Sequence, residues 1–372
     1  MSTFIPMIGE NLFGMTLAEL RGIVAEAGME AYRANQVFTW LYDKHVTDFN
    51  EMTNLSKTQR ETLAARYRLY VPAIVSEQVS SDGTSKFLLA LEDKLEIEAV
   101  YIPSERESAG EPKRRTICVS TQVGCPLDCV FCATASMKLK RNLTTGEILG
   151  QWLALQKHLS QRITNLVFMG MGEPLLNLDN VLRAVEILTH DMTTGIGSRH
   201  ITISTAGLPH EIRRLADSGV NIKLAVSLHS LDEAIRSQLM PINRKHPLAD
   251  LLPSLEYYYR KTKKRITFEY ILFAGLNDSE RDAARLAKLT RRIPGKVNII
   301  PFHHIDHVSK DPGATTFSPS PPDRAEAFIS RLREDNVTVM VRNSSGVDID
   351  AACGQLALTS SRQRIVNSNI VD

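Results

Sequence analysis

The strongest constraint on the fold is a regular alternation of apolar runs and amphipathic segments that begins near residue 114. The runs RRTICVST, TNLVFMG, RHITIST, NIKLAVSLH, RITFEYILF, KVNIIPFH and VTVMVR have the length and composition of buried strands. Segments with helical spacing separate them, at about 144–159, 178–190, 207–218, 247–263, 278–292 and 321–334. This alternation predicts repeated β-α-β units around a parallel sheet.

About six such units fit into this region, fewer than the eight that close a complete TIM barrel. We therefore predict an α/β fold built on a partial, open (β/α)6 TIM-like barrel. A doubly wound parallel sheet is the alternative.

The rest of the chain divides into regions of different pattern. Residues 1–70 predict a small helical domain, with Thr16 and Ser56 as helix caps. Residues 71–113 predict a β-rich linker region that ends in the polar loop SERESAGEPKRR. The barrel core is expected over 114–305 and a C-terminal extension over 306–372.

The cysteines are unevenly distributed. Three of the five lie within GCPLDCVFC, as Cys125, Cys129 and Cys132. A structural zinc site normally has four ligands, whereas three thiolates that hold an iron-sulfur cluster leave one iron open to an external molecule. A zinc site completed by Cys118 and a set of small buried thiols stay open as alternatives.

Composition sets broad limits on location and partners. The N-terminus lacks the pattern of a signal peptide, and no run is long and apolar enough to span a membrane, so we expect a cytoplasmic protein with reduced thiols. The net charge of +2 does not by itself indicate a nucleic-acid binder. Basic residues cluster at 138–141 and 257–265, where they could neutralise phosphates. For the tyrosines of the second cluster we favour a solvated helix face with the tyrosines packed inward.

Several longer motifs together resemble the RlmN/Cfr family of radical S-adenosylmethionine (SAM) enzymes, which methylate adenine carbons in ribosomal and transfer RNA. They are CVSTQVGCPLDCVFCATASMKLKRNLTTGEI, VFMGMGEPLLN, ITISTAG, AVSLHS, MPINRKHP and GVDIDAACGQL. The N-terminal YRANQVFTWLY and FNEMTNLSK also match, so the resemblance spans nearly the whole chain.

The resemblance implies a set of cofactor ligands. Cys125, Cys129 and Cys132 would hold a 4Fe-4S cluster, and SAM would bind its fourth iron. The implied SAM contacts all lie where predicted parallel strands end, as barrel active sites do; they are Gly172, Glu173, Ser204, Ser227, Leu228, His229 and His303. His303 stands where family members commonly have Asn. Glycine turns and helix caps are the alternative explanations for the glycines and serines.

The resemblance also implies a covalent mechanism that uses two SAM molecules per turnover. The first methylates Cys353, and a radical from the second activates that methyl group for addition to adenine. Cys118 would then accept the ring proton and resolve the intermediate through a disulfide with Cys353. Glu98 matches a further proton acceptor, and an exposed strand glutamate is the alternative.

The implied substrates are the peptidyl-transferase-centre adenosine of 23S rRNA and an anticodon-loop adenosine of tRNA, methylated at carbon 2. The target base must be unpaired or extruded. Carbon-8 methylation of 23S rRNA, as in Cfr, is the first alternative, and a metal-stabilised RNA-binding protein without enzyme activity is the second. We expect a monomer, a flavodoxin-like electron donor, and RNA positioning by residues 1–70.

Overall fold

The computed structural model describes residues 9–104, 107–108, 111–112, 114–193, 195–303, 317–342 and 344–358. Part of the predicted polar loop and much of the predicted extension 306–372 therefore lie outside the described residues. Within the described parts, no helix is both long and apolar enough to cross a membrane.

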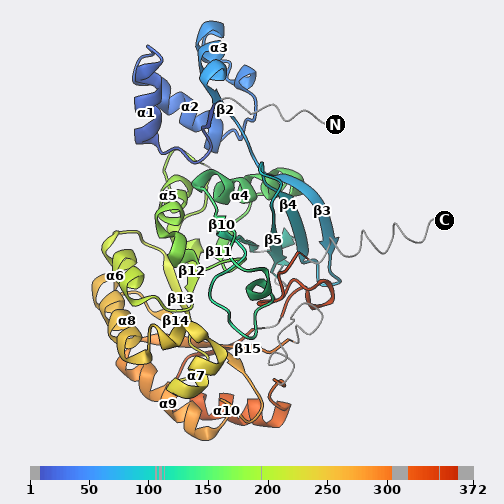
Figure 1. The fold of residues 1–372 in the computed structure, drawn as a ribbon, viewed down its shortest axis with the longest axis vertical. Helices are drawn as coiled ribbons and strands as arrows, with labels where there is room; N and C mark the ends of the chain where they lie inside the picture. The colour runs from blue at the N-terminus through green and yellow to red at the C-terminus, as the bar shows by residue number, and fades with distance from the viewer. Residues whose placement is uncertain are drawn as a thin grey trace, which may run out of the picture.

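A curved sheet forms the centre of the molecule (Figure 1). Seven consecutive parallel strands make up most of it, and each pairs with the next one along the chain. No described pairing joins the first of these strands to the last, so the sheet stays open. The predicted partial barrel is confirmed. The strands are β8 (Arg115–Cys118), β11 (Asn165–Phe168), β12 (Ile201–Thr205), β13 (Lys223–Ser227), β14 (Ile266–Leu272), β15 (Gly295–Pro301) and β16 (Val339–Val341).

Helices follow the parallel strands and run along the outer side of the sheet (Figure 1). Their apolar faces supply much of the main core, as the predicted spacing requires. They are α4 (Thr145–Leu159), α5 (Leu178–Leu188), α6 (Pro209–Asp217), α8 (Leu248–Thr262), α9 (Glu280–Arg292) and α10 (Pro322–Glu334). The sequence did not predict α7 (Glu233–Leu239), which spans only two turns and depends on capping by Asp232.

The β-rich region continues the barrel sheet. Strands β3 (Ala73–Val79), β4 (Ser85–Ala90) and β5 (Glu96–Pro103) form an antiparallel meander. Strand β5 pairs antiparallel with β8, which places Val100 opposite Cys118. Because paired residues point to the same face, the meander supplies one wall beside Cys118.

The N-terminal helices pack against one end of the barrel, over α4 and α5 (Figure 1). The predicted caps Thr16 and Ser56 both form capping boxes. Ring contact between His45 and Trp152 joins this domain to α4. The elements are α1 (Leu17–Glu26), α2 (Arg33–Tyr42) and α3 (Lys57–Arg66), with β1 (Glu10–Asn11) parallel to β2 (Tyr67–Arg68).

Shorter elements complete the described chain. They are strands β6 (Glu107–Ser108), β7 (Glu111–Pro112), β9 (Gln122–Val123) and β10 (Arg141–Asn142), and the 3-10 turns η1 (Phe49–Glu51), η2 (Ala133–Met137), η3 (Pro174–Asn177), η4 (Ser198–His200), η5 (Pro241–Arg244) and η7 (Val347–Ile349).

Candidate active site

The three clustered cysteines lie in a loop that follows the first parallel strand. We call residues 124–132 the cluster loop. Backbone hydrogen bonds fix its course: the Val130 N–H donates to the Leu239 carbonyl at 3.1 Å, and the Cys132 N–H donates to the Cys129 carbonyl at 3.1 Å. All five cysteines of the chain are unbridged thiols.

A cavity at the carboxyl ends of the parallel strands brings most of the predicted site residues together. We call it the cysteine cavity. It includes predicted residues from the cluster loop and from the ends of β11, β12 and β13, and it also reaches the C-terminal part of the chain. Among the residues that line it are Cys125, Cys129, Cys132, Gly172, Glu173, Ser204, Ser227, His229, Arg342 and Cys353.

Two predicted cofactor contacts are not among the described residues that line this cavity. Leu228 is fully buried, and its N–H donates to the Glu269 carbonyl at 3.0 Å. His303 contacts the hydroxyl of Ser344 through its Nε2. Their assignment as SAM contacts stays a prediction.

The three thiols lie close enough together to disfavour one another's thiolate forms. Burial, with a smaller contribution from the neighbouring Cys132, raises the pKa of Cys125 to about 12. The pKa of Cys129 is raised well above its ordinary value by burial and then by the charges of the other two cysteines. A bound cluster cation reverses this repulsion and favours the thiolates. The donor set therefore fits an iron-sulfur cluster held by three cysteines.

The arrangement does not fit the zinc alternative. Among the described residues, no three or more His, Cys, Asp or Glu side chains are grouped so that they could hold a single metal ion. Cys118, the proposed fourth ligand, does not line the cysteine cavity.

Glu173 joins the ends of two parallel strands. Its Oε2 accepts a hydrogen bond from the Ala206 N–H at 2.8 Å, and its Oε1 accepts one from the Leu175 N–H at 3.0 Å. Burial raises the pKa of Glu173 to about 7, and these donors oppose the shift. A cationic amine that enters the cavity would favour its carboxylate form.

Gly172 allows the backbone to turn toward the cavity. Its φ is +98°, and a Cβ at this position would lie 2.5 Å from the Cβ of Gln122. No L side chain fits this combination of conformation and contact.

His229 is a neutral hydrogen-bonding group. Burial, aided by the charge of Arg236, lowers its pKa to about 3. Its Nδ1 accepts a hydrogen bond from the Ile271 N–H at 3.1 Å, so the ring proton resides on Nε2. The ring also lies edge-on to Phe131 of the cluster loop.

A second cavity contains both of the remaining cysteines. We call it the thiol cavity, and its lining includes Cys118, Met169, Arg342 and Cys353. Burial, with a smaller contribution from the nearby Cys353, raises the pKa of Cys118 to about 12, and Arg342 opposes this shift. Cys353 lines both cavities, so its segment lies at their junction.

Arg342 is a site residue that the sequence analysis missed. It follows β16 directly and lines both cavities. The charges of Cys353, Glu269 and Cys118 act to raise its pKa, with Cys353 the largest contributor. Its place just past the end of a predicted parallel strand was the available signal, because active-site residues gather there in barrels.

Glu98 is buried rather than exposed, which removes the simple surface explanation. It lies on β5 and is not among the described residues that line either cavity. Lys86 on β4 forms an ion pair with it. Its role as a proton acceptor stays a prediction.

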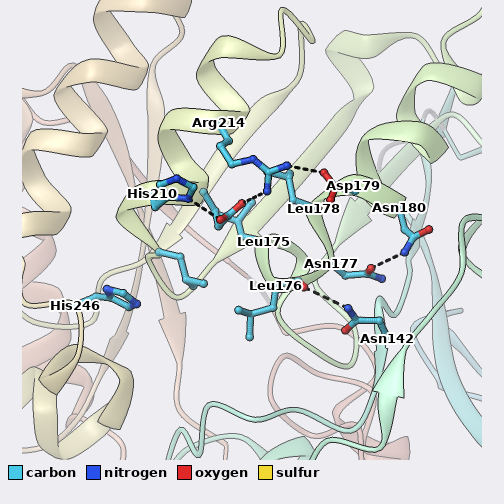
Figure 2. A pocket seen from close by; sticks show the side chains of 12 residues that line it. Asn142, Leu175, Leu176, Asn177, Leu178, Asp179, Asn180, His210, Arg214 and His246 are labelled. Atoms are coloured by element: carbon cyan, nitrogen blue, oxygen red, sulfur yellow. Dashed lines mark hydrogen bonds and ion pairs between the residues drawn. The ribbon is translucent and has the colours of Figure 1, made fainter.

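Figure 2 shows another cavity, of about 350 Å³, between the first turns of α5 and α6. The guanidinium of Arg214 is paired there with Asp179 at 2.6 Å and with Glu211 at 2.7 Å (Figure 2). Because the cation is already neutralised by two carboxylates, this cavity is not a preformed phosphate site.

The basic stretch at 257–265 fits the explanation of a solvated helix face better than that of an RNA-binding surface. Tyr258 is buried and donates its hydroxyl to the Ile222 carbonyl. Tyr257 and Lys261 both contact Asp217.

The chain is similar to known proteins along nearly its whole length. Residues 119–287 match the Radical SAM superfamily, and residues 10–69 match the Ribosomal RNA large subunit methyltransferase N-terminal domain. A probable dual-specificity RNA methyltransferase RlmN from Petrotoga mobilis is 44% identical, over 93% of this chain and 96% of the relative. The dual-specificity RNA methyltransferase RlmN from Alkalilimnicola ehrlichii is 42% identical, over 97% of this chain and 98% of the relative.

A solved structure matches as well. The radical SAM methyltransferase from Sphaerobacter thermophilus is 41% identical and superimposes with a TM-score of 0.84, covering 93% of this chain and 99% of that chain.

Proposed function

The chain belongs to the RlmN family of radical SAM RNA methyltransferases, and from this premise we propose that it methylates carbon 2 of adenine in two RNAs. The proposed substrates are the peptidyl-transferase-centre adenosine of 23S rRNA and an anticodon-loop adenosine of tRNA. Superfamily membership implies a 4Fe-4S cluster and SAM as cofactors.

One observation supports this function most strongly. Cys118 and Cys353 line a single cavity, and Cys353 also lines the cavity of the three clustered cysteines. A methyl carrier must face the methyl donor and then the substrate, and a resolving thiol must reach the same carbon. The position of Cys353 at the junction of the two cavities supports both parts of this proposal.

When bound, the cluster and SAM supply a methyl group and a radical that activates it. In our proposal the sulfur of Cys353 receives the methyl group, and the carbon of that group then bonds to the adenine ring. Cys118 takes the ring proton and forms a disulfide with Cys353 as the intermediate is released. We propose that two SAM molecules are consumed in each turnover.

The buried site dictates the protonation state of Cys118 at rest. With its pKa raised to about 12, this thiol is protonated at neutral pH. It must therefore lose its own proton before it can accept one from the ring. The guanidinium of Arg342 favours the thiolate, and we propose that it assists this step.

The remaining SAM contacts and partners are part of the same proposal. Glu173 would receive the methionyl amine, and Gly172, Ser204, Ser227, Leu228, His229 and His303 would contact the rest of the cofactor. A flavodoxin-like protein would supply electrons, the N-terminal helical domain would position the RNA, and the enzyme would act as a monomer.

Mass spectrometry of nucleosides tests the function directly. Ribosomal RNA and tRNA are purified from cells with and without this chain, and 2-methyladenosine should disappear from both when the chain is absent. Appearance of 8-methyladenosine in its place would assign the Cfr reaction. Unchanged methylation in both RNAs would contradict the proposal.

A further inference from the structure

A buried ion pair lies on the antiparallel meander, outside both cavities. The Nζ of Lys86 on β4 is 3.7 Å from the Oε1 of Glu98 on β5, and the two side chains are only 4% and 3% exposed. The strand register places them diagonally across the same face, the face that also carries Cys118. Because burying two charges costs desolvation free energy, a gain in stability does not by itself explain such a pair.

Both members of the pair contact the segment that carries Cys353, which we call the Cys353 segment (residues 344–358). Lys86 donates from Nζ to the carbonyl of Asp350 at 3.3 Å. The backbone amides of Leu358 and Ala357 lie close enough to the Glu98 carboxylate to lower its pKa, while its Oε2 makes no hydrogen bond within the described residues. Along the chain, the first contact precedes Cys353 and the second follows it. The ion pair therefore contacts the segment on both sides of the reactive cysteine.

The Cys353 segment depends on such contacts for its position. Its described residues contain one short turn, η7, and no strand or α-helix. Asp348 accepts hydrogen bonds from the Ser80 hydroxyl at 2.6 Å and the Ser81 N–H at 3.2 Å. Without a sheet ladder or a helix, individual hydrogen bonds define its course. They include those from the Ala133 N–H to the Gly354 carbonyl at 2.6 Å and from the Thr134 hydroxyl to the Leu356 carbonyl at 2.7 Å.

We propose that Lys86 and Glu98 are positioning residues whose ion pair holds the Cys353 segment at the junction of the cysteine cavity and the thiol cavity. The inference rests on the proposed function in one respect: it assumes that Cys353 is the residue that must be held in place.

The charge of Lys86 opposes the effect of burial on Glu98. Burial raises the pKa of Glu98, and Lys86 is the main charge that lowers it, followed by the Leu358 and Ala357 amides. The other titratable groups on the elements packed against it include Arg115 and Cys118 on β8 and, in the Cys353 segment, Asp348, Asp350 and Cys353. Loss of the Lys86 charge therefore favours protonated Glu98. It removes the contact with the Asp350 carbonyl and weakens the interaction of Glu98 with the Leu358 and Ala357 amides.

Hydrogen-deuterium exchange on the full-length, cluster-reconstituted protein tests whether the ion pair holds the Cys353 segment in place. In Lys86→Met we expect the amides of residues 346–358 to exchange about tenfold faster, because local opening becomes easier. Lys86→Arg should restore slow exchange, since its guanidinium can serve both partners. Arg214→Met, which removes the exposed ion pair of Figure 2, is the control and should leave these amides unchanged.

A double variant separates positioning from a general loss of stability. Lys86→Met combined with Glu98→Leu removes both charges, so no unpaired ion is left buried and the fold is retained. We expect this variant to keep the fast exchange of residues 346–358 and the reduced methylation of Lys86→Met. Slow, wild-type exchange in the double variant would overturn the proposal.

Glu98→Gln distinguishes positioning from proton transfer. A positioning role predicts that Glu98→Gln and Lys86→Met lower the methylation rate to similar extents and both speed exchange of the segment. If Glu98→Gln instead abolishes methylation while exchange stays slow, Glu98 acts as a proton acceptor and our proposal is wrong.

The two proposals fail in different ways. If the wild-type enzyme methylates RNA but Lys86→Met leaves both exchange and rate unchanged, the positioning role is overturned and the function stands. If the wild-type chain methylates no RNA but Lys86→Met still speeds amide exchange in residues 346–358, the proposed function is overturned. The positioning of the segment by the ion pair is then retained.

Discussion

Cys118 and Cys353 share a cavity but differ in environment: Cys118 is 8% exposed, whereas Cys353 is half-buried. In the proposed mechanism Cys353 forms the covalent link to RNA and Cys118 releases it. We expect Cys118→Ala to lower product formation about 10²-fold or more and to accumulate a protein-RNA adduct. Denaturing gel electrophoresis followed by mass spectrometry of the cross-linked peptide measures both.

Cys118→Ala combined with Cys353→Ala is the control, and it should form no adduct. Recovery of only free protein and unmodified RNA from the single variant would argue against a covalent route through Cys353.

Glu173 gives the stability of the cluster-free protein a pH dependence. Its folded-state pKa of about 7 lies above its ordinary value of 4.5, so ionisation is easier in the unfolded chain. The contribution of this group to stability is therefore present at low pH and is lost as pH rises from about 4.5 to 7. Relative to Glu173→Gln, the wild type should lose about 3 kcal/mol of unfolding free energy across this range.

Urea unfolding of both proteins at pH 5 and pH 8 measures this difference. The loss of other contacts in Glu173→Gln shifts the unfolding free energy equally at both pH values. The ionisation of Glu173 is therefore measured by how the difference between the two proteins changes from pH 5 to pH 8. A constant gap between the two proteins would show that the carboxyl titrates normally.

At the scale of elements, the Cys353 segment meets the cluster loop at Gly354. This glycine has φ of +86°, and a Cβ there would lie 2.8 Å from the carbonyl oxygen of Phe131. Gly354→Ala should therefore displace the segment and lower the methylation rate about 10- to 100-fold. The thermal midpoint should also fall modestly, because alanine at a positive φ carries a conformational cost.

Gly219→Ala is a matched control for that variant. Gly219 also has a positive φ, of +73°, but a Cβ there meets nothing within 4 Å. It carries the conformational cost of roughly 1–2 kcal/mol without the collision. Equal methylation rates in the two variants would refute a specific contact between segment and cluster loop.

At the scale of the whole molecule, the cluster loop is separate from the main core. Cys125 and Cys129 pack against a small hydrophobic cluster that includes Leu127, Phe273 and Phe302. Replacing Cys125, Cys129 and Cys132 together by alanine should thus abolish iron binding, about four irons per chain, and methylation without unfolding the barrel. Iron analysis, circular dichroism and urea unfolding measure these effects; a variant that keeps its iron would refute the ligand assignment.

The sequence predicted the barrel well because its strands are short continuous apolar runs, whereas its helices show apolar residues at helical spacing. Capping signals at Thr16 and Ser56 also identified helix starts correctly. The short helix α7 was missed because two turns give too little periodicity to recognise. Arg342 was missed because its one signal, a place just past the end of a predicted strand, is shared by many residues without a role in the site.

The sequence by itself determined the open barrel, the three-cysteine loop and the resemblance that identified the family, since these depend on local spacing and contiguous motifs. Tertiary structure alone decided which distant residues meet. It brought Cys353 beside Cys118, placed Arg342 between two cavities, and buried Lys86 against Glu98 under the Cys353 segment. Such contacts depend on the register of strands and the path of a segment without regular structure, which local sequence patterns do not encode.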